Sequence, residues 1–337
     1  MLKRRILSVL ACVGIVCGWA SFAMGGETRS LCVYDPSGAN GDGFAAMKDY
    51  QVGAAAWGFD LELKPYTNEK TAADDFKAKK CDAVFLTGLR ARNFNKFAAS
   101  LEAMGALPSY DLLDKAVALL SQEKAKKLMR AGDYETVLIM PMGAVYMHVR
   151  DRDNKSIESL AGKKIATIDF DQAAKFMVSK AGASMVAADI STFAGIFNNG
   201  AADACYAPAT AFKPLELEKG VKAKGGIVRY PIAQLTGQIL IHVDRFDEKF
   251  AQSSRDWGRK NFKNILKLST KADSSIPSKY WIDISPEDRA RYDQLFLDVR
   301  VQLRDKEGVY EKDALTIMRR LRCQADKTRP ECAQKKE

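Results

Sequence analysis

The sequence predicts an α/β fold of two lobes, with a cleft between them and long strands that cross from one lobe to the other. Short apolar runs alternate with helical stretches in two separate parts of the chain, over residues 31–88 and 159–209. A long β-rich passage follows each part, over residues 135–150 and 225–244. Strands that alternate with helices are typical of a parallel sheet covered by helices. Two such groups therefore indicate two lobes.

The first group consists of three expected strands and two expected helices. The run LCVYD is short and apolar, FDLELKPY alternates apolar with polar residues, and CDAVFLTG reads as a buried strand. We expect strands over residues 31–35, 59–66 and 81–88, helices over 44–58 and 74–80, and then one long helix over 112–131.

The first β-rich passage, ETVLIMPMGAVYMHVR, contains Pro141 and Gly143 near its middle. Proline has no amide hydrogen, so it cannot donate to the hydrogen-bond ladders that a central strand forms with its two neighbours. We therefore expect two strand pieces or an edge strand here.

The second group repeats the alternation and leads to the helical C-terminal part. We expect a turn and then a strand over residues 159–169, strands over 184–190 and 202–209, helices over 172–181 and 192–199, and further helices over 248–268, 286–306 and 309–323. The resulting division is a signal peptide (1–25), lobe 1 (26–140), lobe 2 (141–236), a return to lobe 1 with C-terminal helices (237–322), and a C-terminal tail (323–337).

The N-terminus has the pattern of a secretory signal peptide. Three basic residues, Lys3 to Arg5, precede an apolar run over 6–23 that ends in small residues. We expect cleavage and a periplasmic location, with an uncleaved anchor as the alternative. Because no other run approaches the length that spans a membrane, a multi-span transporter is excluded.

Charge and cysteine content narrow the function further. The net charge is +10, but the basic residues lie near acids, which does not favour a nucleic-acid partner. The sequence has only two histidines, and it predicts neither a metal site nor a cofactor. We expect a local disulfide between Cys323 and Cys332, and a second between Cys32 and Cys81 if their strands are neighbours. Cys205 would then be the odd thiol.

Ligands of open α/β sheets lie beyond the carboxyl ends of the strands. The side chains that could contact a solute there, or on the β-rich passages, are Asp35, Ser37, Asp42, Arg90, Arg92, Tyr146, Asp169, Phe170, Asp171, Tyr206, Gln234 and Gln238. Each also has a purely structural interpretation, such as a helix cap or a solvated strand edge. No catalytic group can be assigned.

The segments LAGKKIAT, GASMV and FNNGAADACYAPATAF resemble, in this order, the second lobe of the periplasmic solute-binding proteins of TRAP transporters, the DctP type. CVYD, GDGF and CDAVFLTGLRARNFNKF are similar to a divergent branch of these proteins. The resemblance covers about residues 30–320. It implies a type II periplasmic-binding-protein fold that closes over a small solute.

The resemblance also implies an arginine on the strand after the G-x-K-I turn, which would bind a substrate carboxylate. Ala166 stands there instead. Either Arg90 or Arg92 takes over from the other lobe, or the solute is cationic or polar and meets Asp169 and Asp171.

These observations predict a monomeric periplasmic protein that binds a small polar or charged solute and delivers it to membrane transporter subunits. Two alternatives stay open. The first is an enzyme on the same scaffold, with Cys205 as its best nucleophile. The second is an interaction protein of the cell envelope.

Overall fold

A computed structural model describes residues 26–222 and 224–337. The predicted signal peptide, residues 1–25, lies outside this part of the chain. Among the helices that are described, none combines the length and the hydropathy needed to cross a bilayer.

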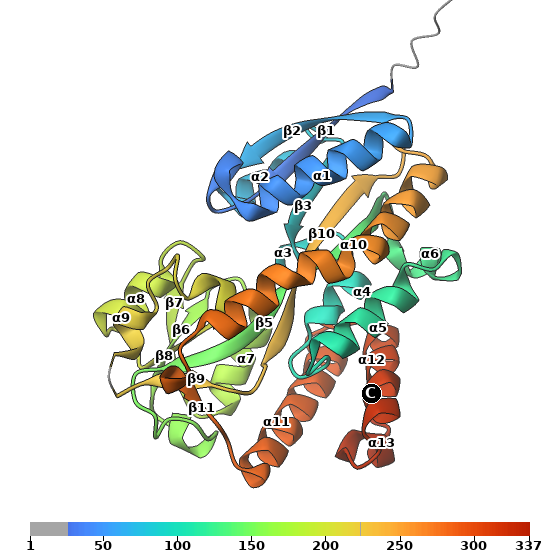
Figure 1. Cartoon of the computed structure of the whole chain (residues 1–337). Helices are drawn as coiled ribbons and strands as arrows, with labels where there is room; N and C mark the ends of the chain where they lie inside the picture. Colours follow the sequence, from blue (N-terminus) through green and yellow to red (C-terminus); the bar gives the residue numbers. More distant parts are fainter. Residues whose placement is uncertain (1–25, 223) are drawn as a thin grey trace, which may run out of the picture.

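One continuous sheet forms the centre of the molecule, in the strand order β2-β1-β3-β10-β5-β8-β6-β7 (Figure 1). The strands at one end, which we call lobe 1, are β1 (Glu27–Tyr34), β2 (Phe59–Tyr66) and β3 (Ala83–Thr87). The strands at the other end, which we call lobe 2, are β6 (Lys164–Ile168), β7 (Ser184–Ala188) and β8 (Ala204–Pro208). Within each lobe these strands pair in parallel. The expected fold of two α/β lobes is confirmed.

Two long strands, β5 (Tyr134–Val149) and β10 (Ala233–His242), join the lobes. They pair with each other in antiparallel fashion; β10 also pairs with β3 of lobe 1, and β5 with β8 of lobe 2. The expectation of two strand pieces or an edge strand is therefore wrong, because β5 is one continuous central strand. Pro141 is tolerated because the pairing register shifts beside it, between Leu235 and Thr236 of β10.

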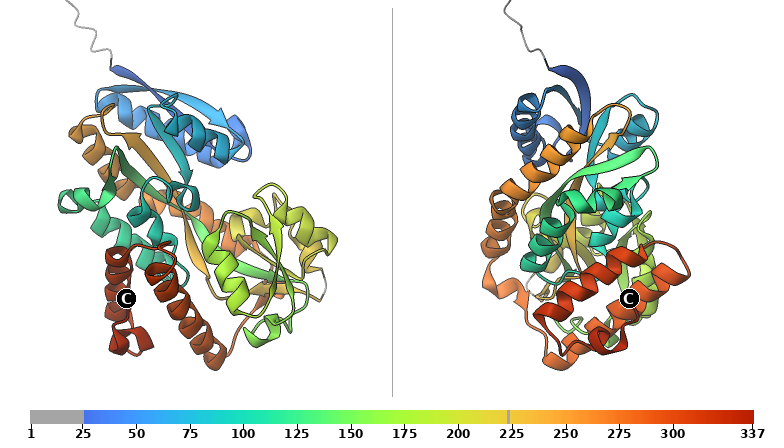
Figure 2. Two further views of the ribbon diagram at one scale, coloured as in Figure 1. Left: turned by 180° about the vertical axis from the view of Figure 1, so that it is seen from behind. Right: turned by 90° about the vertical axis from the view of Figure 1, so that its right-hand side faces the viewer.

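Helices cover both ends of the sheet, and the two views of Figure 2 show α10 lying along the joining strands. The helices of at least seven residues are α1 (Asp42–Ala56), α2 (Glu69–Lys77), α5 (Tyr110–Leu120), α7 (Gln172–Lys180), α8 (Phe193–Asn199), α10 (Glu248–Ser275), α11 (Pro286–Asp305) and α12 (Lys312–Ala325). The shorter helices are α3 (Gly88–Ala91), α4 (Lys96–Ala99), α6 (Lys126–Met129), α9 (Glu218–Val221) and α13 (Pro330–Gln334). The short strands are β4 (Arg130–Ala131), β9 (Gly226–Val228) and β11 (Trp281–Ile282).

The single helix expected over residues 112–131 is wrong. Helix α5 ends at Leu120, and a short 3-10 turn and α6 follow. The backbone becomes extended at Gln122. The Ser121 carbonyl oxygen accepts a hydrogen bond from the Gln252 side chain at 3.0 Å, so an outside donor satisfies it where the helix stops.

Both expected disulfides are present. Cys32 of β1 is joined to Cys81 just before β3, with their Cα atoms 5.9 Å apart, because β1 and β3 are neighbours. Cys323 and Cys332 are joined across the turn between α12 and α13. The division of the chain into lobes after residues 140 and 236 stays a proposal. Both boundaries fall on the joining strands, where Pro141 pairs with Thr236.

Candidate binding site between the lobes

The lobes meet where α3 of lobe 1 approaches the loop after β6 of lobe 2. The guanidinium carbon of Arg90 lies 3.7 Å from the centre of the Phe170 ring, which is a cation–π contact between the lobes. Behind it, Nε of Arg90 lies 3.5 Å from the Glu69 carboxylate. Glu69 is buried and accepts hydrogen bonds from the Thr87 amide at 2.8 Å and the Thr87 hydroxyl at 2.7 Å. The start of α2 thus fixes the end of β3.

Arg92 differs from Arg90 in having no carboxylate partner among the described residues. Its guanidinium lies 5.4 Å from the centre of the Tyr310 ring. Nε of Arg92 is buried without a hydrogen bond, and no ion pair to this side chain is found in the described chain. A guanidinium in such a position is available for a bidentate contact with a carboxylate.

Glu102 lies against Gly88 at the start of α3, on a one-turn 3-10 helix that spans Ser100–Glu102. Its Oε1 accepts hydrogen bonds from the amide of Thr236 at 2.7 Å and from the hydroxyl of Thr236 at 2.8 Å. Gln238 also donates to the Thr236 hydroxyl, at 3.1 Å. Burial raises the pKa of Glu102 to about 7, against the opposing effects of these hydrogen bonds and of Arg92.

On the lobe 2 side, Asp171 follows Phe170, and Tyr206 contacts the end of the same strand. Asp171 caps α7 through a hydrogen bond that its Oδ1 accepts from the Ala174 amide at 3.1 Å. Burial raises the pKa of this carboxyl group, and nearby Arg92 partly offsets the effect. The hydroxyl oxygen of Tyr206 accepts from the Ile168 amide at 2.9 Å, which leaves its proton free to donate. Burial and the charge of Asp171 raise the pKa of this phenol.

Five of the twelve predicted solute contacts lie at the contact between the lobes or on the segments next to it: Arg90, Arg92, Phe170, Asp171 and Tyr206. Gln238 belongs to the same group through Thr236. Gln234 also lies on β10 and is only 1% exposed, and both polar atoms of its side chain lack a hydrogen bond.

The remaining predicted contacts lie in other surroundings. The carboxylate of Asp35 accepts hydrogen bonds from the amides of Ser37, Gly43 and Phe44, so it organises its own loop. Ser37, Asp42 and Asp169 are exposed. Tyr146 packs edge-on against Trp281 at 5.0 Å, on the side of the sheet where Asp273 lies.

Sequence reasoning missed the two buried acids, Glu69 and Glu102. Glu69 follows the carboxyl end of β2, so the strand-edge rule could have found it. Glu102 is a lone acid in the apolar segment FAASLEAMGAL, and such a residue must find a buried partner.

The histidines and Cys205 have structural surroundings. His148 is buried against Phe212, and burial lowers its pKa to about 4. Nε2 of His242 bonds to the Phe76 carbonyl at 2.8 Å. Cys205 is fully buried, and burial raises the pKa of its thiol, which disfavours the nucleophilic thiolate. No cluster of metal-ligand side chains occurs over residues 26–222 and 224–337.

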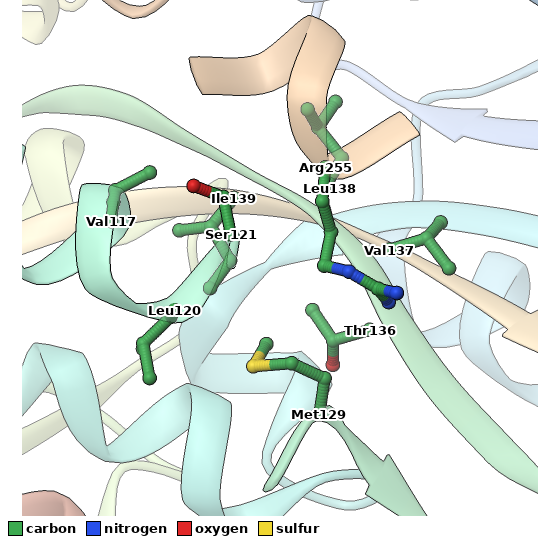
Figure 3. A pocket seen from close by; sticks show the side chains of 9 residues that line it. All are labelled: Val117, Leu120, Ser121, Met129, Thr136, Val137, Leu138, Ile139 and Arg255. Carbon is green, nitrogen blue, oxygen red and sulfur yellow. The ribbon is translucent and has the colours of Figure 1, made fainter. Parts of the chain in front are cut away.

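Two small cavities lie away from the site. One, of about 10 Å³, is lined by residues of α5, β5 and α10, including Thr136 and Arg255 (Figure 3). The other, also about 10 Å³, lies between β5, β9, α7 and α11. Each has room for about one water molecule, which is too little for a metabolite.

A substitution at Gly88 tests how closely Glu102 and Thr236 pack against α3. A Cβ atom at this position would lie 2.3 Å from Oε1 of Glu102 and 2.4 Å from the hydroxyl oxygen of Thr236. We expect Gly88→Ala to lower the free energy of unfolding by about 1–3 kcal/mol, measured by urea denaturation. Gly195→Ala on α8 is the control, because a Cβ atom there meets nothing within 4 Å. Equal effects of the two substitutions would contradict the packing described here.

Comparison with solved structures shows which class of protein shares this fold. The fold matches periplasmic solute-binding proteins of TRAP transporters. One is from Ralstonia eutropha H16 with bound (S)-2-acetolactate, with a TM-score of 0.69 and 11% identity over 88% of this chain and 99% of that one. Another, from Desulfovibrio salexigens with bound orotic acid, has a TM-score of 0.68 and 12% identity over the same shares.

The sequence comparisons give the family. The profile of "Solute-binding protein AdeT 1/2" matches residues 52–337. "Probable solute-binding protein AdeT1" of Acinetobacter baumannii is 38% identical over 301 residues, which are 89% of this chain and 99% of that protein. The chain belongs to the AdeT 1/2 family of solute-binding proteins.

Proposed function

We propose that this protein binds a small carboxylate-bearing solute between its lobes in the periplasm and delivers it to a membrane transporter. The observation that carries the proposal is Arg92 at the end of α3, whose buried Nε has no hydrogen bond and which follows closely on the interlobe contact of Arg90 with Phe170. In this proposal Arg92 binds the solute carboxylate from lobe 1. The arginine expected at the position of Ala166 would have bound it from lobe 2. The solutes in the two similar structures, acetolactate and orotic acid, carry carboxyl groups, which is consistent with this role.

Lobe closure follows from the contact of Arg90 with Phe170. The contact joins a residue of lobe 1 to a residue of lobe 2 at 3.7 Å. A solute must therefore enter before this contact forms, and the bound solute stabilises the state in which it is made. In our proposal the protein acts as a monomer and has no catalytic group.

The test is a thermal-shift and calorimetric screen of small carboxylates, including orotate and acetolactate. We expect at least one carboxylate to raise the melting temperature of the wild type, and Arg92→Gln to weaken its binding by tenfold or more, the loss expected when a charge-assisted pair is removed. Arg320→Gln is the control, because Arg320 is exposed on α12. Glutamine keeps the backbone hydrogen bond from Arg92 to the Gly88 carbonyl oxygen, and no side-chain hydrogen bond of Arg92 is found among the described residues, so circular dichroism should be unchanged. If Arg92→Gln binds as well as the wild type, the proposal is wrong.

A further inference from the structure

Four lysines follow one another along the outer side of α10. All four side chains are exposed, and the geometry of the α-helix places them within about 80° of its circumference and along about 16 Å of its length. The opposite side of the helix is buried, at residues such as Phe262 and Ser269. We call the four residues the lysine row: Lys260, Lys263, Lys267 and Lys271.

Acids of the same helix do not neutralise the lysine row. The sequence has no Asp or Glu between Asp256 and Asp273. Other helices pair a lysine with an acid one turn away, as Lys70 pairs with Asp74. Asp256 is the single acid of α10 that lies one turn from the row, and its carboxylate accepts a hydrogen bond from Gln252 at 2.8 Å. None of the ion pairs in the part of the chain that the structure describes includes a lysine of the row.

The position of α10 leaves the lysine row open to solvent. The helix packs against α1 and α5 of lobe 1, against β5, and against the 3-10 turn Ala209–Ala211 of lobe 2. Figure 1 shows it in front of the joining strands, with none of the other described elements over its outer side. On the neighbouring α5, Asp114 is already paired with Arg259. The row therefore presents uncompensated positive charge along the junction of both lobes.

The chemistry of the row favours a lipid surface as its partner. Lysine carries a compact charge on a flexible stem, which suits many phosphate groups without a fixed geometry, whereas arginine suits single anions that are bound in a defined geometry. Leu268 follows Lys267 on the helix and is 50% exposed. An exposed apolar side chain beside several basic ones is typical of a helix that lies at the interface of a membrane.

We propose that the lysine row binds the anionic headgroups of a phospholipid membrane and that Leu268 inserts between them. This inference goes beyond the proposed function and does not depend on which solute is bound. Contact with the membrane would concentrate the protein where a transporter subunit lies. Each lysine that approaches an anionic surface strengthens partitioning roughly fivefold, and added salt weakens it.

The test is co-sedimentation of the protein, purified from the periplasm, with vesicles of two compositions. One is phosphatidylcholine alone, and the other contains equal parts of phosphatidylcholine and phosphatidylglycerol. We expect the protein to bind only the second and to be released by salt. The row variant, which combines Lys260→Gln, Lys263→Gln, Lys267→Gln and Lys271→Gln, should partition at least tenfold less.

A control variant separates the row from net charge. It replaces four exposed lysines of other segments, and thus changes the net charge equally: Lys77→Gln, Lys213→Gln, Lys306→Gln and Lys312→Gln. We expect it to keep most of the wild-type binding. All these side chains are exposed, so circular dichroism should show an unchanged fold for both variants.

Three results would overturn the inference. They are no binding of the wild type to the anionic vesicles, equal binding to both compositions, and equal losses in the row variant and the control variant. Binding to poly-L-glutamate without binding to the vesicles would indicate an acidic protein as the partner, and would also overturn it. The proposed solute site, which is tested at Arg92, would stand in each case.

The role of Leu268 has its own test. Leu268→Gln is expected to weaken binding to the anionic vesicles several-fold, because the inserted side chain would no longer be apolar. Met185→Gln is the control, because Met185 is 44% exposed on β7, at the edge of the sheet. Equal binding of Leu268→Gln and the wild type would contradict the insertion of Leu268.

Discussion

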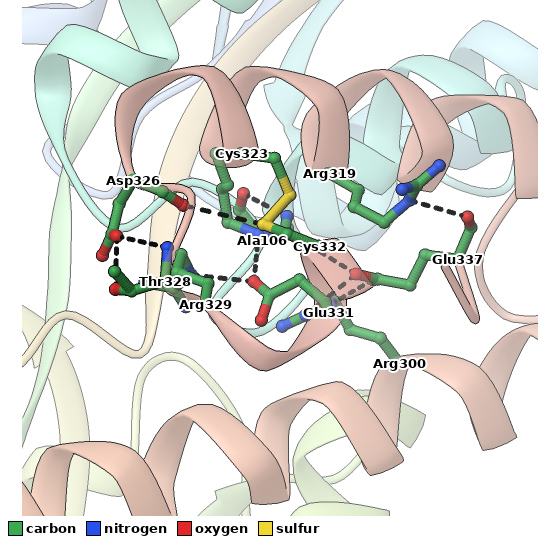
Figure 4. Close-up of a disulfide and its surroundings, with 11 residues drawn as sticks. Ala106, Arg300, Arg319, Cys323, Asp326, Thr328, Arg329, Glu331, Cys332 and Glu337 are labelled. Carbon is green, nitrogen blue, oxygen red and sulfur yellow. Dashed lines mark hydrogen bonds and ion pairs between the residues drawn. A yellow bond between two sulfur atoms is a disulfide. The ribbon is translucent and has the colours of Figure 1, made fainter. Parts of the chain in front are cut away.

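Replacing Glu337 by alanine is expected to lower the free energy of unfolding by about 3–5 kcal/mol, the effect of leaving the buried charge of Arg300 without its carboxylate partner. The Glu337 carboxylate accepts hydrogen bonds from Arg300 (Figure 4). It also accepts one from Arg322. These arginines are 1% and 0% exposed, and they also donate to the carbonyl oxygens of Met104 and Ala106 at 2.7 Å each. Helices α11 and α12 and the segment after α4 therefore meet at this carboxylate, and Arg322 has a second carboxylate partner in Glu331 of α13, at 2.8 Å.

Chemical denaturation of matched variants measures this effect. Lys336→Ala is the control, because Lys336 is exposed and only its carbonyl oxygen is used, by Arg304. Glu337→Gln should fall between the wild type and Glu337→Ala, because an amide oxygen can still accept from one arginine. A loss below about 0.5 kcal/mol for Glu337→Ala, the size of an ordinary surface effect, would contradict a role for this residue in the core.

Glu102→Gln is expected to stabilise the protein at high pH but not at low pH. Burial raises the pKa of Glu102 from 4.5 to about 7, so the folded state keeps the proton that the unfolded state loses in this window. The wild type therefore loses stability as the pH rises from 4.5 to 7, by up to about 3 kcal/mol above pH 7. Glutamine removes this loss and keeps an oxygen for both bonds from Thr236.

The measurement is the free energy of unfolding of wild type and Glu102→Gln at pH 4, 5.5, 7 and 8.5. The difference should be small at pH 4, grow through pH 7 and level off above it. The charged groups that act on Glu102 are Arg92 and Asp171, and neither is changed by the substitution. A difference that does not vary with pH, or that shrinks as the pH rises, would contradict the environment assigned to Glu102.

The fold was predictable where local pattern and tertiary structure agree. The alternation in FDLELKPY corresponds to β2, and the apolar run before Thr87 to the buried strand β3. The errors arose where tertiary contacts override local preference. A register shift lets Pro141 stay inside β5, and Gln252 of a distant helix caps the chain where α5 stops. Neither neighbour is visible in the local sequence.

The site was predictable only in part, for a similar reason. The strand-edge rule identified Arg92 and Asp171, because the carboxyl ends of β3 and β6 both face the junction of the lobes. It also selected Asp35, whose carboxylate is used by the amides of its own loop. Glu102 is not at a strand end, and its role depends on Thr236, which is 134 residues away along the chain.

The most direct test of the account is native mass spectrometry of the protein purified from the periplasm of expressing cells. The wild type should carry a one-to-one small-molecule adduct that contains a carboxyl group, and Arg92→Gln, purified in the same way, should lack it. A wild type that never carries such an adduct, or an Arg92→Gln variant that carries the same one at the same occupancy, would contradict solute binding at Arg92 between the lobes.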